Sequence, residues 1–168
     1  MRRLLNCVYT AAGILAAVFM IGVLVCITLA IVVRQISMHI PGLDAYAGYC
    51  MAAAGFLALA YTFKKGEHIR VTLLLSSLQP RARIRLDAFA LAIGTIIAAN
   101  LAWFSCKLVL DSYAYNDIST GEDATALWIP QLSMAIGSVI FFIALLDETI
   151  CRLWGQPERN TQESTLHE

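Results

Sequence analysis

The chain has 168 residues, of which 59% are hydrophobic and only 14% are charged, and its formal net charge is zero. Soluble domains usually carry about 45–50% apolar and about 25% charged residues, so this chain falls outside that class. The balance of charges also excludes a disordered chain and a nucleic-acid-binding protein, because neither sign is in excess. The composition therefore indicates an integral membrane protein.

Four stretches without a charged residue are long enough to cross a membrane as helices. They cover residues 4–33, 45–63, 88–106 and 124–146. A bilayer core about 30 Å thick requires about 20 apolar residues in a helix, whereas the strands of a membrane barrel would alternate between apolar and polar residues. We therefore predict an all-α integral membrane protein whose four transmembrane helices form one domain over residues 1–150. The remaining residues, 151–168, are expected to form a polar cytoplasmic tail that is partly disordered.

The positions of the basic residues predict how these helices are oriented. All but two of the twelve basic residues, Arg34 and Lys107, lie at the N-terminus, between the second and third stretches, or in the tail. Basic residues accumulate on the cytoplasmic side of membrane proteins. Both termini and the middle loop are therefore expected in the cytoplasm. The outer side is expected to be acidic and carries Asp44, Asp111, Asp117, Glu122 and Asp123.

The four stretches contain no Asp, Glu, Lys, Arg or His and no central proline. Channels, pumps and secondary transporters place ionisable groups or broken helices at membrane depth, because a solute needs a polar route. This chain is therefore not expected to carry a solute by itself. Asn100 is the one costly polar group near the middle of a stretch, and its expected role is to hold helices together.

The sequence has no pattern typical of a metal site, a cofactor site or a catalytic centre. The three histidines, His39, His68 and His167, lie outside the four stretches, and the five cysteines form no Cys-x-x-Cys pair. No nucleophile elbow and no glycine-rich phosphate loop occur. We predict no cofactor, no metal and no catalytic residue, so the chain is not expected to be an enzyme. A disulfide between Cys50 and Cys106 is left open, because both lie near the outer ends of their stretches.

The segment after the second stretch begins with a basic pair, Lys64 and Lys65. Positive charge at a helix C-terminus is favourable, and anionic lipid headgroups attract it. The apolar residues that follow have the i, i+3, i+4, i+7 spacing of one helix face. They are Val71, Leu74, Leu75 and Leu78. This spacing predicts a short amphipathic helix along the cytoplasmic membrane surface, ended by Pro80.

The segment after the second stretch, together with the four stretches themselves, resembles a known family. The residues that carry the resemblance are Gly66-Glu67-His68-Ile69-Arg70-Val71 directly after a second span, and Ile129-Pro130 at the opening of a fourth. In a four-span chain of this size they resemble the small membrane subunit, DctQ type, of tripartite ATP-independent periplasmic (TRAP) transporters. Two positions depart from the family pattern. Thr72 stands where many members have an acidic residue, and Ala135 and Ile136 precede Gly137 where many have a proline.

The resemblance implies an accessory scaffold subunit of a sodium-coupled secondary transporter that takes up an organic acid anion across the bacterial inner membrane. In such transporters a large membrane subunit (M type) carries sodium and substrate by an elevator-type motion. A periplasmic substrate-binding protein delivers the substrate. The small subunit is then expected to stabilise the large one, to help dock the binding protein and to contact phospholipid, with no nucleic acid as a partner.

Two sets of residues follow from these implied roles. The interface with the large subunit or with lipid is expected at Lys64, Lys65, His68, Arg70, Val71, Leu74, Leu75 and Leu78. The face on which the periplasmic binding protein docks is expected at Asp44, Asp111, Asp117, Glu122 and Asp123. An alternative interpretation is a self-contained four-helix membrane protein with a structural or small-ligand-binding role.

Overall fold

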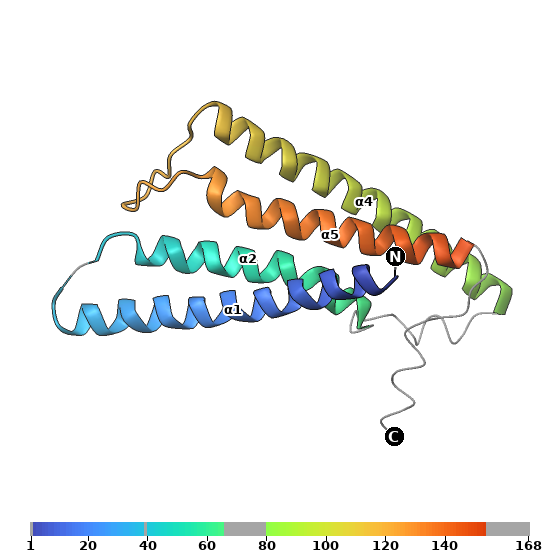
Figure 1. Ribbon diagram of the computed structural model, residues 1–168, viewed down its shortest axis with the longest axis horizontal. Coiled ribbons are helices and arrows are strands. Elements are labelled where there is room, and N and C mark those ends of the chain that lie inside the picture. Colours follow the sequence, from blue (N-terminus) through green and yellow to red (C-terminus); the bar gives the residue numbers. More distant parts are fainter. Residues whose placement is uncertain (1, 39, 66–79, 154–168) are drawn as a thin grey trace, which may run out of the picture.

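The computed structural model describes residues 2–38, 40–65 and 80–153, and its regular structure there is helical apart from one isolated bridge between Ile118 and Ala126 (Figure 1). The helices are α1 (Arg2–Gln35), α2 (Leu43–Lys64), α4 (Pro80–Ala114) and α5 (Trp128–Leu153). Each contains a segment that is long and apolar enough to span a membrane. The prediction of an all-α chain with four membrane helices is confirmed. The amphipathic helix predicted before residue 80 lies outside the described residues.

The third and fourth helices differ from the apolar stretches at their ends. α4 begins at Pro80, which therefore opens a helix. Proline suits the first turn because its missing N–H would have no partner there. Lys107 and Asp111 interrupt the apolar run but lie inside the helix, which continues to Ala114. α5 begins at Trp128, inside the fourth apolar stretch. The residues of that stretch before Trp128 belong to a folded loop.

The four helices form two hairpins that pack against each other. α1 packs on α2, α4 packs on α5, and the hairpins meet through α2 and α5. The helices therefore follow the order α1, α2, α5, α4, with α1 and α4 at the two edges (Figure 1). The membrane segments of α1 and α4 are accordingly less buried than those of α2 and α5. Both hairpin loops, 36–42 and 115–127, lie at the same end of the molecule (Figure 1).

α1 contacts the rest of the bundle along a single stripe. Its buried and half-buried residues repeat at alternating intervals of three and four, which places them on one side of a helix. They are Leu5, Tyr9, Ala12, Ala16, Phe19, Val23, Cys26, Ala30 and Val33. Apart from Gly13 and Gly22, the other residues of α1 from 5 to 35 are exposed. This exposed face is mostly aliphatic, which suits the hydrocarbon core of a bilayer.

Glycines allow two of the helix crossings to be unusually close. A Cβ atom added at Gly137 of α5 would lie 2.6 Å from the carbonyl carbon of Phe56 in α2. A Cβ atom added at Gly13 of α1 would lie 2.7 Å from Cδ2 of Tyr61. Small residues at such crossings let membrane helices pack by van der Waals contact. The two glycines therefore set how closely α5 and α1 approach α2.

Candidate functional site

The two lysines at the C-terminus of α2 define the lysine end of the bundle. Nζ of Lys64 donates a hydrogen bond to Oδ1 of Asn6 and lies 5.0 Å from the centroid of the Tyr9 ring. Nζ of Lys65 lies 5.6 Å from the centroid of the Tyr61 ring. Such cation–π contacts are favourable. The half-buried Lys64 is therefore bound to α1, and the exposed Lys65 is the more accessible of the two.

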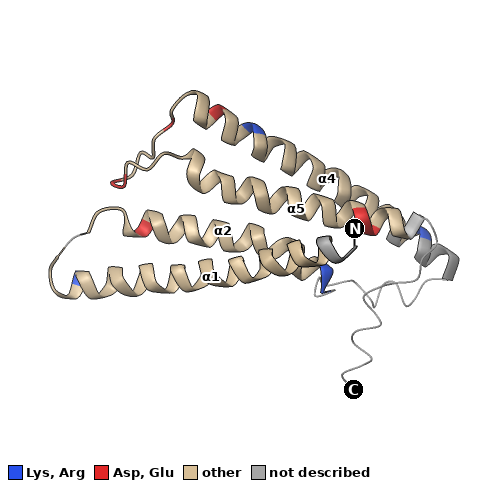
Figure 2. Ribbon diagram, in the orientation of Figure 1, with Lys and Arg blue, Asp and Glu red and all other residues tan. Residues whose placement is uncertain are grey.

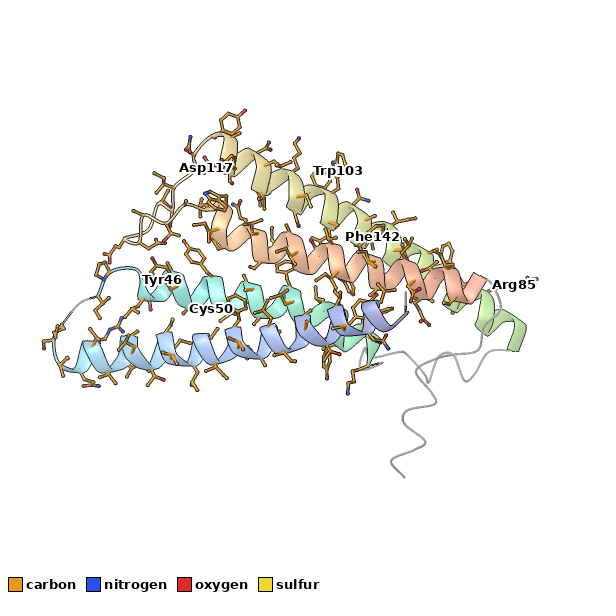
Figure 3. All side chains as sticks on the ribbon, viewed as in Figure 1. Tyr46, Cys50, Arg85, Trp103, Asp117 and Phe142 are labelled. Carbon is orange, nitrogen blue, oxygen red and sulfur yellow. The ribbon has the colours of Figure 1, made fainter. Side chains whose placement is uncertain are left out.

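The other residues predicted for the large-subunit or lipid interface lie outside the described residues. They are His68, Arg70, Val71, Leu74, Leu75 and Leu78. At the edge of that segment, Arg85 of α4 is exposed and lies near the end of the molecule opposite the hairpin loops (Figure 3). The described part of the lysine end therefore presents Lys65 and Arg85 as its exposed basic groups. No contact among the described residues of the lysine end identifies a ligand.

The opposite end of the bundle, residues 36–38, 40–44 and 111–127, is called here the acidic end (Figure 2). It brings together all the residues predicted for the docking of the binding protein. They are the exposed Asp44, Asp111, Asp117 and Glu122, and the half-buried Asp123. Asp44 lies in the first turn of α2, where a carboxylate interacts favourably with the helix dipole.

The loop between α4 and α5 is folded by its own backbone. The Asp117 N–H donates to the Ser112 carbonyl at 3.0 Å, which turns the chain at the end of α4. A short two-stranded contact follows, because the Ser119 N–H donates to Thr125 O at 2.8 Å and the Leu127 N–H donates to Asp117 O at 3.0 Å. The loop therefore has a fixed backbone, which holds the side chains near its tip in place.

Asp123 is the centre of a hydrogen-bond network between this loop and α2. The Tyr49 hydroxyl donates to Oδ2 of Asp123 at 2.9 Å, and the Ser119 hydroxyl donates to Oδ1 at 2.8 Å. The Tyr49 hydroxyl also lies 3.1 Å from the Ser119 hydroxyl oxygen. One turn earlier on α2, the Tyr46 hydroxyl accepts a hydrogen bond from Thr125 at 3.2 Å. Two tyrosines of α2 thus bind the loop to the opposite hairpin.

This network keeps Asp123 ionised. Partial burial works against the charged form, but hydrogen bonds from neighbouring hydroxyl groups, those of Ser119 and Tyr49 among them, outweigh it and lower the pKa of Asp123 to about 2. Hydrogen bonds to a carboxylate favour its charged form because they stabilise the negative oxygens. Both Asp123 oxygens are therefore used within the chain. The other four carboxylates of the acidic end belong to exposed residues.

The loop between α1 and α2 packs against the same residue. Gly42 has a φ angle of 84°, and a Cβ atom added there would lie 2.6 Å from Cβ of Asp123. Next to this contact lies a pocket of about 280 Å³ between the end of α1 and the start of α2. The charged residues of its lining are Arg34, Asp44 and Glu122. The two hairpin loops therefore meet at Asp123 and share one pocket.

Three residues of this network, Tyr49, Ser119 and Thr125, were not predicted as a group. Their hydrogen bonds to the opposite hairpin join positions 70 to 79 residues apart in the chain. The local signal is limited to tyrosines at the start of a span, which is typical of residues at the membrane interface. A network between such distant positions can therefore be recognised only when the packing of the two hairpins is known.

The described residues contain no group of three or more His, Cys, Asp and Glu side chains arranged to hold a metal ion. All five cysteines are free thiols. A Cβ atom added at Gly22 of α1 would lie 3.3 Å from Sγ of Cys50, so this thiol packs against α1. Cys106 is exposed on α4, and α5 lies between α4 and α2. Cys50 and Cys106 are therefore on helices that are not neighbours.

Comparison with known proteins identifies the family. A model of the DctQ component of tripartite ATP-independent periplasmic transporters matches residues 23–155, from within α1 to beyond the end of α5. No curated protein gives a significant match. DctQ proteins belong to a three-part system with the membrane component DctM and a periplasmic binding protein. The match covers most of the chain and agrees with its four apolar helices, so the chain belongs to the DctQ family of TRAP transporter small membrane subunits.

Proposed function

We propose that this chain is the accessory scaffold subunit of a sodium-coupled TRAP transporter that takes up an organic acid anion. In this proposal it stabilises the large membrane subunit and does not form the route of the solute. The observation that carries the proposal is the absence of Asp, Glu, Lys, Arg and His from the four apolar stretches of a chain from a transporter family. Transport routes require polar or charged groups at membrane depth.

The hydrogen bonds inside the helices support this proposal. The hydroxyl groups of Thr62, Ser133 and Ser138 donate to carbonyl oxygens of their own helices. A hydroxyl group that donates its one hydrogen in this way has no second donor for an anion. These three hydroxyl groups therefore offer no hydrogen-bond donor to a passing organic anion.

A fixed scaffold also requires the small subunit to move as one body. An elevator-type transporter moves one part of the large subunit against a stationary part, so the stationary part must resist lateral force. Here the two hairpins are joined by the backbone contact at Gly137 and by the Asp123 network at the acidic end. We propose that this bundle widens the stationary part in the bacterial inner membrane.

We propose further that the acidic end faces the periplasm and helps dock the binding protein, with both termini in the cytoplasm. The positive-inside rule supports this orientation, because the exposed carboxylates and the basic residues gather at opposite sides of the chain. Asp44, Asp111, Asp117 and Glu122 would attract a basic surface on the binding protein. Asp123 would shape the face, because its oxygens are bound internally.

The docking role can be tested by charge reversal at the acidic end. Changing Asp117→Lys together with Glu122→Lys should raise several-fold the binding-protein concentration that gives half-maximal uptake at low salt, and this difference should shrink at high salt. Lys65→Glu at the lysine end is the control, with wild-type dependence on the binding protein expected. An unchanged dependence in the double variant would refute this docking surface.

At the lysine end we propose contact with phospholipid or with the large subunit. Lys65 and Arg85 are exposed there, and anionic headgroups of the cytoplasmic leaflet attract such groups. The predicted interfacial residues that follow, including His68 and Arg70, belong to the same proposal. If Arg70→Glu leaves both complex assembly and uptake intact, Arg70 is not an interface residue.

The scaffold role itself is tested by reconstitution into lipid vesicles. The large subunit, this chain and the binding protein together should take up the substrate under a sodium gradient. This chain alone should give no uptake, and the large subunit with the binding protein but without this chain should give much less than the complete set. Full uptake without this chain, or uptake by this chain alone, would contradict the proposed function.

A further inference from the structure

The outward face of α4 differs from every other exposed helix face that the structure describes, because it carries an amide at mid-membrane depth. Asn100 lies close to the middle of the span Ala88–Ala114, and it is exposed. Ala98 and Ala102, two positions before and after it, are buried. Each helical residue turns by about 100°, so Asn100 points to the side of α4 opposite its contact with α5. Figure 3 shows Trp103, from the same side, directed away from α5.

The Asn100 side chain is only partly satisfied within the chain. Its Nδ2 donates to the Ile96 carbonyl of its own helix at 3.0 Å. A side-chain amide has two N–H donors and a carbonyl acceptor, so one N–H and the oxygen have no further partner among the described residues. Lipid chains offer no hydrogen-bonding group, and a polar group left unsatisfied in hydrocarbon is costly. The amide therefore favours a protein partner over lipid at this face.

The residues around Asn100 form a packing stripe. They recur at alternating intervals of four and three residues, which is the spacing of a helix that packs lengthwise against another helix. They are Phe89, Ile93, Ile96, Asn100 and Trp103, and each is exposed. Trp103 keeps 72% of its surface exposed, the largest value for a large hydrophobic residue within the apolar stretches. This set is called here the α4 stripe.

The opposite edge of the bundle provides the comparison. The exposed residues of α1 include Ile14, Val18, Ile21 and Leu24, and α1 is the most apolar of the four spans. Between Thr10 and Arg34 the one exposed polar residue of α1 is Thr28, whose short hydroxyl can bond to the backbone of its own helix. The exposed face of α1 is therefore suited to lipid, and the α4 stripe is suited to another membrane helix.

We infer that the α4 stripe is the surface that binds the large membrane subunit, through a transmembrane helix that carries a polar side chain at the depth of Asn100. This inference rests on the proposed function, because it takes the large subunit as the partner. A second copy of this chain is disfavoured by shape. The small residues that permit close crossings, Ala98 and Ala102, already face α5, and bulky Ile96 and Trp103 flank the amide.

The test is site-specific photo-crosslinking in membranes that contain this chain co-expressed with the large subunit and the binding protein. Benzoylphenylalanine replaces Ile96 or Trp103 on α4, Ile21 or Leu24 on α1, and Ala52 on the exposed side of α2. Adducts are identified by mass spectrometry. We expect adducts with the large subunit from the two α4 positions, at several-fold higher yield than from α1 or Ala52. Equal or higher yields from α1 or Ala52, adducts between two copies of this chain, or no adduct would overturn the inference.

A second measurement tests the amide itself. Asn100→Leu leaves the internal packing of the bundle unchanged, because Asn100 bonds only to its own helix among the described residues. It should weaken association with the large subunit in detergent by about 3- to 30-fold, the range expected for a lost hydrogen bond between membrane helices. The matched variant Thr28→Leu on α1 should associate like the wild type. Wild-type association of Asn100→Leu would refute the role of the amide.

The partnership with the large subunit and the binding surface on α4 are tested separately. If the unmodified chain does not co-purify with the large subunit at all, the proposed function fails and the inference fails with it. If the complex forms but the cross-links come from another surface, only the assignment of α4 is wrong. The crosslinking experiment therefore separates a wrong partner from a wrong surface.

Discussion

The two hairpins of this chain have the same general design but are held together by different chemistry. In the α1–α2 hairpin, a long apolar stripe of α1 lies on α2, and Gly13 fits against the ring of Tyr61. In the α4–α5 hairpin, small residues such as Ala98 and Ala102 line the contact, and two hydroxyl groups meet between the helices. Membrane helices gain no hydrophobic advantage from pairing inside lipid, so close fit and a few hydrogen bonds must hold them. The α1–α2 hairpin is held by close fit, and the α4–α5 hairpin combines close fit with a contact between two hydroxyl groups.

The contact between the hairpins is expected to be the most sensitive point of the molecule. Gly137→Ala places a Cβ atom 2.6 Å from the Phe56 carbonyl carbon, so α5 must move away from α2. We expect a loss of about 1–3 kcal/mol in the free energy of unfolding, as for other overpacked cores. Thermal unfolding in detergent measures it. The control is Gly55→Ala on α2, where no atom lies within 4 Å of the added Cβ atom. It should be neutral or stabilise by up to about 1 kcal/mol, and equal losses in both variants would contradict the contact.

The meeting point of the two hairpin loops should be the next most sensitive. Gly42→Ala should destabilise the chain for two reasons. Gly42 has a φ angle of 84°, and an added Cβ atom would lie 2.6 Å from Cβ of Asp123. A left-handed conformation costs a residue with a side chain about 1–2 kcal/mol. We expect a destabilisation of that size, measured by the same unfolding experiment. Gly48→Ala is the control, because it has open space around the added atom. A Gly42→Ala variant as stable as Gly48→Ala would show that the loops do not hold this geometry.

The hydrogen bonds that join the hairpins at Asp123 should make the stability of the chain depend on pH. The pKa of this carboxyl is about 2 in the folded chain against an ordinary value of 3.8. The unfolded chain therefore takes up the proton first as the pH falls. The stabilisation should be complete above about pH 4 and should be lost between about pH 4 and pH 2. Thermal unfolding across this range in detergent checks the expected loss.

Asp123→Asn should remove this part of the pH profile and should lower stability at neutral pH. The matched variant Asp117→Asn, in the same loop but exposed, should keep the profile. If wild type and Asp123→Asn lose stability in parallel below pH 4, another acidic group is responsible. The effect is expected to be smaller than that of either glycine change, because Ser119 and Tyr49 still contact each other when the charge is gone.

The helices themselves could be predicted, because uncharged runs of membrane length are a property of the sequence alone. The ends of the helices were less predictable. Lys107 interrupts the apolar run but does not end α4, since a helix can continue past the hydrocarbon core. Pro80 opens α4 well before the apolar run 88–106 begins. The order of the helices, the Asp123 network and the side of α4 on which Asn100 lies depend on contacts between distant segments, which no local pattern contains.

The smallest expected effect concerns the hydroxyl pair within the α4–α5 hairpin. Thr95 and Thr149 have their Oγ1 atoms 2.8 Å apart, and each also bonds to a carbonyl of its own helix. Each hydroxyl has one hydrogen, so the bond between the helices competes with the bonds inside them. Thr95→Val should therefore cost only about 0.6 kcal/mol, the average for hydrogen bonds between membrane helices.

A double-mutant cycle isolates this bond. The interaction energy of Thr95→Val with Thr149→Val measures the pair, because each single variant also loses a bond inside its own helix. Thr62→Val in α2 is the control, since its hydroxyl bonds only to its own helix at Ala58 and Leu59. A coupling near zero, or a loss in Thr62→Val as large as that in Thr95→Val, would mean that close packing alone holds α4 to α5. The two hairpins would then be held together by the same chemistry.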